Sequence, residues 1–216
     1  MQELPCPSRN HTLPLPGQPP LRIAVPENPE ALLDALTDEE YEKDQLLPYW
    51  AEQWPSGQAL LSFLSGRQFQ DEWLLCELGC GLGMISAAVA SLTDAFTVAT
   101  DIAPQGCRFT RHNIMTNGGT PRVVCCDWRH LPLRQRFDAV IASDVLYEQR
   151  WIEPVIAAID GLLKPDGRAW IADPCRRFWP LFKELLGRRG FSPAVYPYPA
   201  VEGEAGLFEV LEITRR

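Results

Sequence analysis

The 216-residue sequence has no excess of basic residues, because its 28 Asp and Glu outnumber its 20 Lys and Arg and give a formal net charge of −8. Binding along an extended phosphate backbone needs clustered Lys and Arg, so this balance disfavours a nucleic acid as the partner. One local basic pair, Arg176 and Arg177, is interpreted as part of a solvent-exposed face.

Long apolar stretches and paired cysteines are missing as well. The sequence contains no uncharged apolar run long enough to span a membrane, and its proline-rich start does not resemble a signal peptide. The seven cysteines are odd in number and include no C-x-x-C pair, which argues against a disulfide framework and against a zinc site. We therefore expect a cytoplasmic protein in a reducing environment, without a membrane partner.

The first 29 residues are set apart by composition, since they hold eight of the 20 prolines. Such a segment is compatible with an extended arm. It is also compatible with a small hairpin in which residues 11–15 pair with residues 21–25 across an intervening Pro-Gly-Gln-Pro-Pro turn.

Two helix starts follow the proline-rich segment. Asn28-Pro29 is typical of a helix N-cap followed by proline at the first helical position. The stretch 37–40, Thr-Asp-Glu-Glu, is a capping box that predicts a second helix ending near Leu47. We expect residues 1–47 to form an N-terminal extension of helices and a proline-rich arm, followed by one domain over residues 48–216.

From residue 73 onward, short apolar runs alternate with segments of helical periodicity, which predicts a parallel sheet with helices on both faces. We therefore expect a Rossmann-like α/β fold with a seven-stranded, mostly parallel sheet. The predicted strands cover residues 73–78, 96–100, 121–125, 137–142, 167–173, 193–198 and 207–214. The predicted helices cover residues 56–64, 84–92, 104–116, 151–163 and 178–188, and the stretch 164–167, Lys-Pro-Asp-Gly, is a predicted turn.

The most informative segment is residues 73–83, Trp-Leu-Leu-Cys-Glu-Leu-Gly-Cys-Gly-Leu-Gly. An apolar strand ends in an acidic residue, and three alternating glycines then lead into a predicted helix. Glycine permits turn conformations that other residues avoid and lets a ligand approach the backbone closely. The following helix directs free N–H groups towards that ligand. This pattern predicts a turn that binds a nucleotide-like cofactor.

Three residues indicate which cofactor is bound. Met84 occupies the position where a dinucleotide-binding fingerprint needs its third glycine. Glu77 would repel a pyrophosphate but attract an ammonium group. Asp101 ends the next apolar run about 20 positions after the glycines, a spacing that suits ribose hydroxyls. A ligand with a ribose, an amino group and no phosphate is S-adenosylmethionine, and we predict it as the cofactor.

Acidic residues also mark the ends of the predicted parallel strands. In a parallel sheet, ligands bind at the carboxyl ends of the strands, where these side chains meet. The five strand-end acids are Glu77, Asp101, Asp127, Asp144 and Asp173.

Residues 48–175 resemble the class I, seven-β-strand methyltransferases that depend on S-adenosylmethionine. The glycine loop resembles the first motif of that family, Asp101 its ribose-binding acid, and Asp127-Trp128 its adenine-contacting motif. The cofactor-binding residues that the resemblance implies are Trp54, Glu77, Gly79, Cys80, Gly81, Gly83, Asp101, Ile102, Asp127, Trp128 and Ser143.

Two further segments are similar to protein lysine methyltransferases, in particular to the subgroup that includes the electron-transfer flavoprotein β-subunit lysine methyltransferase. The first is Trp54-Pro-Ser-Gly57, and the second is Asp144-Val-Leu-Tyr147 at the end of the fourth predicted strand of the sheet. The resemblance implies an enzyme that methylates lysine side chains of a protein substrate. We expect Asp144 to orient the incoming amine and Tyr147 to close the channel, and we predict both as catalytic residues.

The substrate prediction has alternatives. A small-molecule N- or O-methyltransferase would use the same cofactor motifs, and a non-catalytic module could bind S-adenosylmethionine with the same fold. An open cleft beside Asp144 and Tyr147 would favour a protein substrate, whereas a sealed pocket would favour a metabolite. Enzymes that methylate base amines carry an Asn/Asp-Pro-Pro-Tyr/Phe motif where this chain has Ser-Asp-Val-Leu at 143–146, which again disfavours a nucleic acid.

Overall fold

The structure is a computed structural model that describes residues 3–15, 17–37, 39, 47–134, 136–198 and 207–216. The strands are β1 (Ser8–Leu15), β2 (Gln18–Pro26), β3 (Leu74–Leu78), β4 (Phe96–Asp101), β5 (Val123–Cys125), β6 (Phe137–Ser143), β7 (Leu163–Asp173), β8 (Phe191–Tyr198) and β9 (Phe208–Arg215). The α-helices are α1 (Pro29–Asp34), α3 (Pro55–Ser65), α4 (Met84–Leu92), α5 (Pro104–Thr116), α6 (Ile152–Leu162) and α7 (Trp179–Arg188), and short 3-10 helices cover Tyr49–Ala51, Trp128–His130 and Gln149–Trp151.

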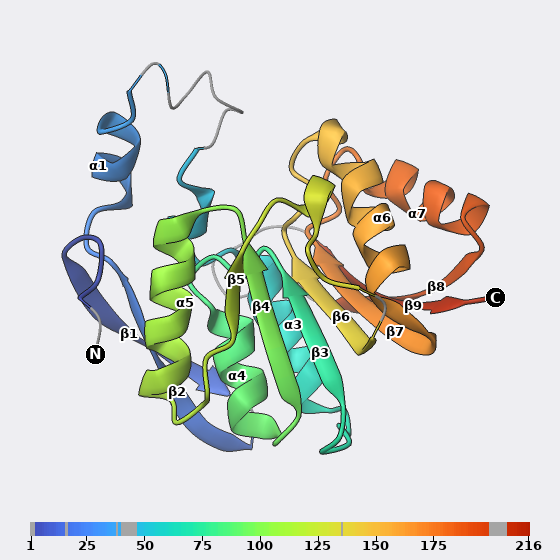
Figure 1. Cartoon of the computed structure of the whole chain (residues 1–216), viewed down its shortest axis with the longest axis horizontal. Helices are drawn as coiled ribbons and strands as arrows, with labels where there is room; N and C mark the ends of the chain where they lie inside the picture. Colours follow the sequence, from blue (N-terminus) through green and yellow to red (C-terminus); the bar gives the residue numbers. More distant parts are fainter. Residues whose placement is uncertain (1–2, 16, 38, 40–46, 135, 199–206) are drawn as a thin grey trace.

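A seven-stranded sheet in the order β5-β4-β3-β6-β7-β9-β8 forms the centre of the molecule (Figure 1). Strands β3 to β7 are parallel to one another, and β9 runs antiparallel to both β7 and β8. The predicted α/β fold with a mostly parallel seven-stranded sheet is thereby confirmed. The strand order reverses next to β3, so that β4 and β6 flank it and a crevice opens at the carboxyl ends of the three strands.

Two apolar cores cover the two faces of the sheet, because successive side chains of a strand point to opposite faces. In β6, Ala139 and Ile141 belong to the core formed with α3, α4 and α5, whereas Val140 and Ala142 belong to the core formed with α6 and α7. Each parallel strand is thus buried on both sides, which explains its nearly continuous apolar sequence.

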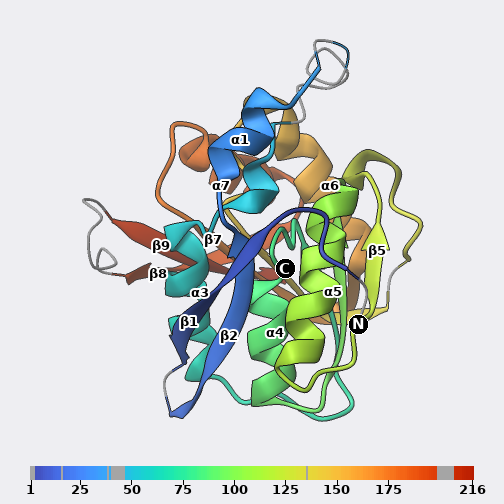
Figure 2. The same ribbon diagram turned by 90° about the vertical axis from the view of Figure 1, so that its left-hand side faces the viewer.

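The proline-rich start forms an antiparallel hairpin of β1 and β2, one of the two arrangements that its sequence allowed. Leu13 pairs with Leu21 and His11 with Ile23. Leu13, Leu21 and Ile23 are buried in the same core as α3, α4 and α5, and Figure 2 shows the hairpin lying across these helices. The boundary predicted at residue 47 stays a prediction.

Two side-chain amides of α5 fasten this hairpin. Asn113 accepts a hydrogen bond from the Ala24 amide at 2.8 Å and donates one to the Ala24 carbonyl at 3.0 Å. Asn117, one helical turn later, makes the same pair of bonds with Arg22 at 3.0 and 2.9 Å. Asn113 also donates to the carbonyl of Leu82 at 2.8 Å. Helix α5 therefore links the hairpin to the glycine loop between β3 and α4.

The segment before the apolar part of β7 differs from its predicted structure. The turn predicted at residues 164–167 is wrong, because β7 runs from Leu163 through these residues to Asp173. The register with β6 shifts between Phe137 and Ala139, so the proline and glycine produce an irregularity inside a continuous strand.

The helix predicted over residues 37–47 falls mostly outside the described residues. Within the part of the chain that the structure describes, no helix has the length and apolar character needed to cross a membrane.

Candidate active site

A cavity of about 740 Å³ lies at the carboxyl ends of β3, β4 and β6. Small-molecule and cofactor sites typically measure roughly 300–1,000 Å³. Its wall combines the segment before α3, the glycine loop, and the residues that follow β4, β6 and β7. Eleven of the thirteen predicted site residues line it: Trp54, Glu77, Gly79, Cys80, Gly81, Asp101, Ile102, Trp128, Ser143, Asp144 and Tyr147.

The other two predicted site residues, Gly83 and Asp127, are not among the residues that line the cavity. Gly83 is the N-cap of α4, and a Cβ atom there would lie 2.6 Å from the Cα atom of Thr110, so this glycine allows α5 to approach closely. Asp127 accepts hydrogen bonds from the backbone amide and the Nε of Arg129, both at 2.8 Å. The predicted cofactor contacts of Gly83 and Asp127 stay predictions.

The glycine loop has the backbone conformation that its sequence indicates. Gly79, Gly81 and Gly83 have φ angles of 70°, 48° and 75°, in the left-handed region that glycine enters without a steric penalty. The amide of Gly81 donates to Asp101 Oδ2 at 2.8 Å, and the other carboxylate oxygen accepts from the Ala103 amide at 2.8 Å. Asp101 thus fixes the loop against the end of β4.

Glu77 is a buried acid on the cavity wall. The Ser86 hydroxyl donates a hydrogen bond to Oε2 of Glu77. Burial raises the pKa of the Glu77 carboxyl to about 8, and the nearby Asp101 charge adds to the rise. A cationic group placed beside Glu77 would offset this desolvation cost and favour the ionised form.

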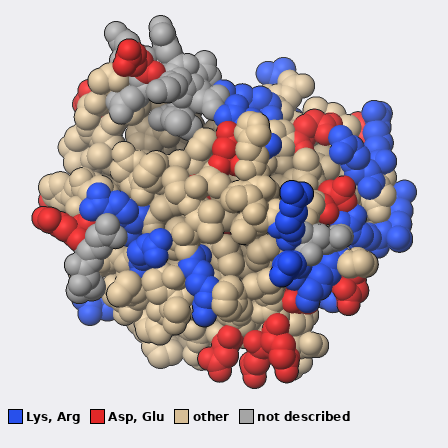
Figure 3. Space-filling view, viewed as in Figure 1, with Lys and Arg blue, Asp and Glu red and all other residues tan. Residues whose placement is uncertain are grey.

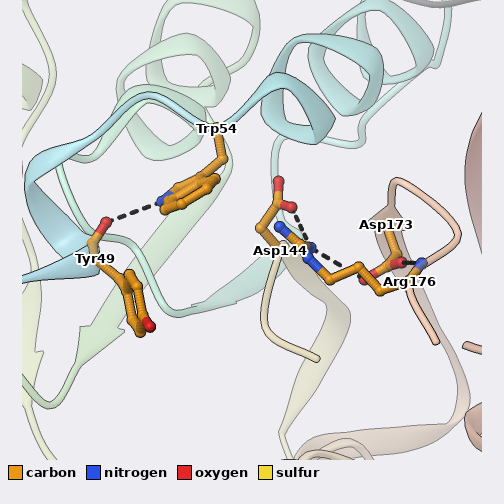
Figure 4. A network of polar contacts seen from close by, with 5 residues as sticks. All are labelled: Tyr49, Trp54, Asp144, Asp173 and Arg176. Atoms are coloured by element: carbon orange, nitrogen blue, oxygen red, sulfur yellow. Dashed lines mark hydrogen bonds and ion pairs between the residues drawn. The ribbon is translucent and has the colours of Figure 1, made fainter. Parts of the chain in front are cut away.

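Aromatic rings form a second part of the wall. Tyr49 contacts Trp54 and Tyr147, with ring centroids 6.0 and 5.0 Å apart. Trp151 continues the series, with its centroid 6.3 Å from that of Tyr147 and 5.7 Å from that of Trp128. The indole N–H of Trp54 donates to the Tyr49 carbonyl at 2.9 Å (Figure 4). This bond fixes the orientation of the Trp54 ring at the cavity wall.

Two buried acids share one arginine next to Trp54 (Figure 4). Arg176 Nη1 lies 2.5 Å from Oδ1 of Asp144 and 3.4 Å from Oδ2 of Asp173. The Arg176 amide also donates to Asp173 Oδ1 at 2.7 Å, and the guanidinium carbon lies 5.8 Å from the Trp54 ring centroid. The arrangement joins the ends of β6 and β7 to the segment that precedes α3.

Asp144 keeps one carboxylate oxygen open. The residue is 8% exposed, and its Oδ2 is buried without a hydrogen-bond partner among the described residues. Burial raises the pKa of Asp144, while the Arg176 cation and the nearby hydroxyl and backbone amide of Ser56 lower it. Burial also raises the pKa of Asp173, to about 6. Asp144 has a φ of 58°, a left-handed conformation that aspartate tolerates better than most residues.

Sequence reasoning missed two residues of the wall. Trp50 lines the cavity, and its carbonyl oxygen lies 3.2 Å from the position of a Cβ atom on Gly81. The interpretation of Arg176 as solvent-exposed is wrong, because its side chain is 26% exposed and bound to two acids, whereas its neighbour Arg177 is exposed. The sequence does contain a signal for this pairing, because an arginine follows a strand-end acid by three residues.

Comparison with known proteins finds similarity to methyltransferases. Residues 75–167, from β3 into β7, match a family described as a methyltransferase domain. The chain is 34% identical over 110 residues to the electron transfer flavoprotein beta subunit lysine methyltransferase of Danio rerio, covering 47% of this chain and 40% of that protein. It is 27% identical over 133 residues to the ribosomal protein L11 methyltransferase of Klebsiella pneumoniae (strain 342), covering 59% and 45% respectively. The matches span less than half the length of these two relatives.

A solved structure supports the same grouping at the level of the fold. The magnesium protoporphyrin IX methyltransferase from Synechocystis PCC 6803, crystallised with bound S-adenosylmethionine, superposes with a TM-score of 0.61 at 19% identity, covering 87% of this chain and 97% of that chain. The sheet order and the glycine loop agree with the matched methyltransferase domain, and the chain resembles the class I, S-adenosylmethionine-dependent methyltransferases, including the protein lysine methyltransferase subgroup.

Proposed function

We propose that this chain transfers the methyl group of S-adenosylmethionine to the ε-amine of a lysine side chain in a protein substrate. The observation that carries the proposal is Oδ2 of Asp144, a buried acceptor on the wall of the cavity that has no hydrogen-bond partner among the described residues. A buried carboxylate oxygen without a donor is costly, and an N–H of an acceptor amine would satisfy it.

The other side of the cavity fits the cofactor. Glu77 is suited to the amino group, because a buried acid is stabilised by a cation. Each carboxylate oxygen of Asp101 accepts one backbone N–H and keeps a further lone pair for a ribose hydroxyl. Trp128 lies against the glycine loop, 3.1 Å from the position of a Cβ atom on Gly79, where a purine ring can stack. When bound, the cofactor supplies a methyl carbon that its sulfonium has already activated.

The remaining task of the protein is to prepare the amine. A lysine amine has a reference pKa of roughly 10.4 and must lose a proton before it can attack a carbon atom. Asp144 accepts a remaining N–H of the neutral amine and thereby directs the nitrogen lone pair. Tyr147 packs against Tyr49 with ring centroids 5.0 Å apart, which helps to exclude water and limits the approach of the acceptor.

Two observations support a protein acceptor. The relatives named above are, by their names, enzymes that act on proteins. The basic side chains gathered near α6 and α7 are interleaved with acids (Figure 3). Three arginines there form ion pairs: Arg188 with Glu184 at 2.5 Å, Arg189 with Glu153 at 2.6 Å and Arg215 with Asp160 at 2.5 Å. Paired charges of this kind are a poor match for a phosphate backbone.

Cofactor affinity is expected to rise with pH. Burial raises the pKa of Glu77 to about 8, so at lower pH the carboxyl must lose its proton before it can pair with the cofactor ammonium. The dissociation constant at about pH 6 should be at least about tenfold higher than at about pH 8.5. Isothermal titration calorimetry at the two pH values measures this difference. A Glu77→Gln variant should bind weakly at both, and a wild-type affinity independent of pH would contradict the assignment of Glu77.

Transfer of labelled methyl groups into a cell lysate tests the proposed function. The products are separated into protein, nucleic acid and small molecules, and an Asp144→Asn protein serves as the matched control. We expect base-stable label in a discrete protein band that maps to lysine and is lost with the control. Label confined to small molecules would replace the proposal with a metabolite methyltransferase. Cofactor binding without any label would favour a non-catalytic module.

A further inference from the structure

Asp144 and Arg176 line the acceptor end of the cavity, and Asp173 contacts Arg176 without being among the lining residues. Asp144 and Asp173 are both buried, with 8% and 1% exposure, and Arg176 is the cation in contact with both. Ser56, at the start of α3, adds an uncharged polar group beside Asp144. The other charged or titratable residues of the wall lie at the glycine loop, around Tyr147 or in the segment before α3: Tyr49, Glu52, Glu77, Cys80, Asp101, Tyr147 and Arg150.

Arg176 contacts one of the two carboxylate oxygens of Asp144. One oxygen, Oδ1, receives Nη1 of Arg176 at 2.5 Å, whereas Oδ2 has no partner among the described residues. Arg176 is itself held by Asp173 through its backbone amide at 2.7 Å and its side chain at 3.4 Å, and by the face of Trp54. An arginine fixed from three sides leaves the open oxygen available for the acceptor.

We propose that Arg176 is a positioning residue that balances the charge at this end of the cavity, so that the acceptor amine binds in its neutral form. The inference rests on the proposed function. The two carboxylates carry two negative charges, and the guanidinium together with the cofactor sulfonium carries two positive ones. A buried site without net charge does not compensate an ammonium for its lost hydration, and it therefore favours the neutral amine. The proton is therefore released to solvent as the amine enters, and the nitrogen arrives with a free lone pair.

Removing the guanidinium charge should change the pH dependence of turnover in a defined direction. In an Arg176→Gln variant, the uncompensated carboxylates would hold the acceptor as an ammonium, and their own protonation would become easier. Both effects move the acid limb of kcat/KM to higher pH. We expect a displacement of at least about one pH unit and a loss of about 10- to 100-fold at neutral pH.

Variants at two adjacent arginines make the test specific. Arg176→Lys keeps the charge but loses the planar fork, so its acid limb should stay in place while kcat falls by up to about tenfold. Arg177→Gln removes the same charge one residue away, from an exposed position, and should match the wild type. Thermal unfolding and cofactor affinity verify that each variant is folded. If Arg176→Gln and Arg177→Gln share one acid limb, the inference is wrong. If Arg176→Gln does not fold, a displaced limb in Arg176→Lys overturns it.

A binding measurement separates this inference from the proposed function. n-Butylamine, a primary amine of lysine side-chain length, is titrated into the complex with S-adenosylmethionine and followed by the indole N–H resonance of Trp54. Wild-type protein should bind it at least about tenfold more tightly at about pH 9.5 than at about pH 7, because more of the amine is neutral at the higher pH. Arg176→Gln should lose this preference. Equal wild-type affinity at both pH values would refute charge balancing, whereas absence of methyl transfer by the wild type would refute the proposed function.

Discussion

An Asp144→Asn variant is expected to lose at least about 100-fold in kcat/KM for methyl transfer, with its affinity for S-adenosylmethionine within about twofold of the wild type. The substitution preserves the size of the side chain, and asparagine accepts the left-handed φ of 58° at this position. What disappears is the negative charge facing the acceptor. Because the proposed cofactor contacts are made by Glu77 and Asp101, which the substitution leaves in place, cofactor binding should be spared.

Single-turnover transfer of labelled methyl groups, together with calorimetric cofactor binding, measures both parts of this expectation. Asp166→Asn is the matched control, since Asp166 is exposed, lies in β7 and is not among the residues that line the cavity. It should transfer methyl groups at the wild-type rate. Wild-type turnover in Asp144→Asn would remove Asp144 from the catalytic site, and a parallel loss of cofactor affinity would assign it to cofactor binding instead.

A Gly81→Arg variant is expected to raise the dissociation constant for S-adenosylmethionine by more than about 100-fold, a loss of roughly 3 kcal/mol in binding free energy. Gly81 has a φ of 48°, and a Cβ atom there would lie 3.2 Å from the Trp50 carbonyl. A long cationic side chain would therefore be directed into the cavity, where it competes with the cofactor for Asp101 and Glu77.

A control variant separates the effect of backbone strain from obstruction of the cavity by the new side chain. Gly118, after the end of α5, also has a positive φ, of 82°, but a Cβ atom on it would have no heavy atom within 4 Å. A Gly118→Arg variant should carry a comparable backbone cost of roughly 1–2 kcal/mol in the free energy of unfolding while binding the cofactor normally. If both variants keep normal affinity, the glycine loop is not the cofactor site.

The strands, and the edge of the sheet at which the cavity lies, could be predicted from the sequence because they depend on local patterns. Strands buried on both faces are apolar along their length, and alternating glycines fix the position of the turn after β3. Since parallel strands end at one edge, Glu77, Asp101 and Asp144 reach the same cavity. The roles of the individual site residues stay predictions until variants are measured.

What the sequence did not predict depends on partners far away in the chain. The stretch 164–167 has the composition of a turn, but Leu163 and Arg168 on either side of it pair with β6 and keep it inside one strand. Arg176 looks like a surface residue until the ends of β6 and β7 bring two acids to it. Contacts between side chains that the fold brings together leave no periodic pattern in the sequence.

The hydrogen bonds from the side-chain amides of Asn113 and Asn117 to the N-terminal hairpin affect the order in which parts of the chain fold during synthesis. Ala24 is separated by 89 residues from Asn113, the residue that binds it. At a synthesis rate of about 5–20 residues per second, the hairpin waits roughly 5–20 s on the ribosome before its docking helix exists. The glycine loop is also made before Asn113, which binds the Leu82 carbonyl. The hairpin and the loop therefore reach their final positions together, when α5 folds against both.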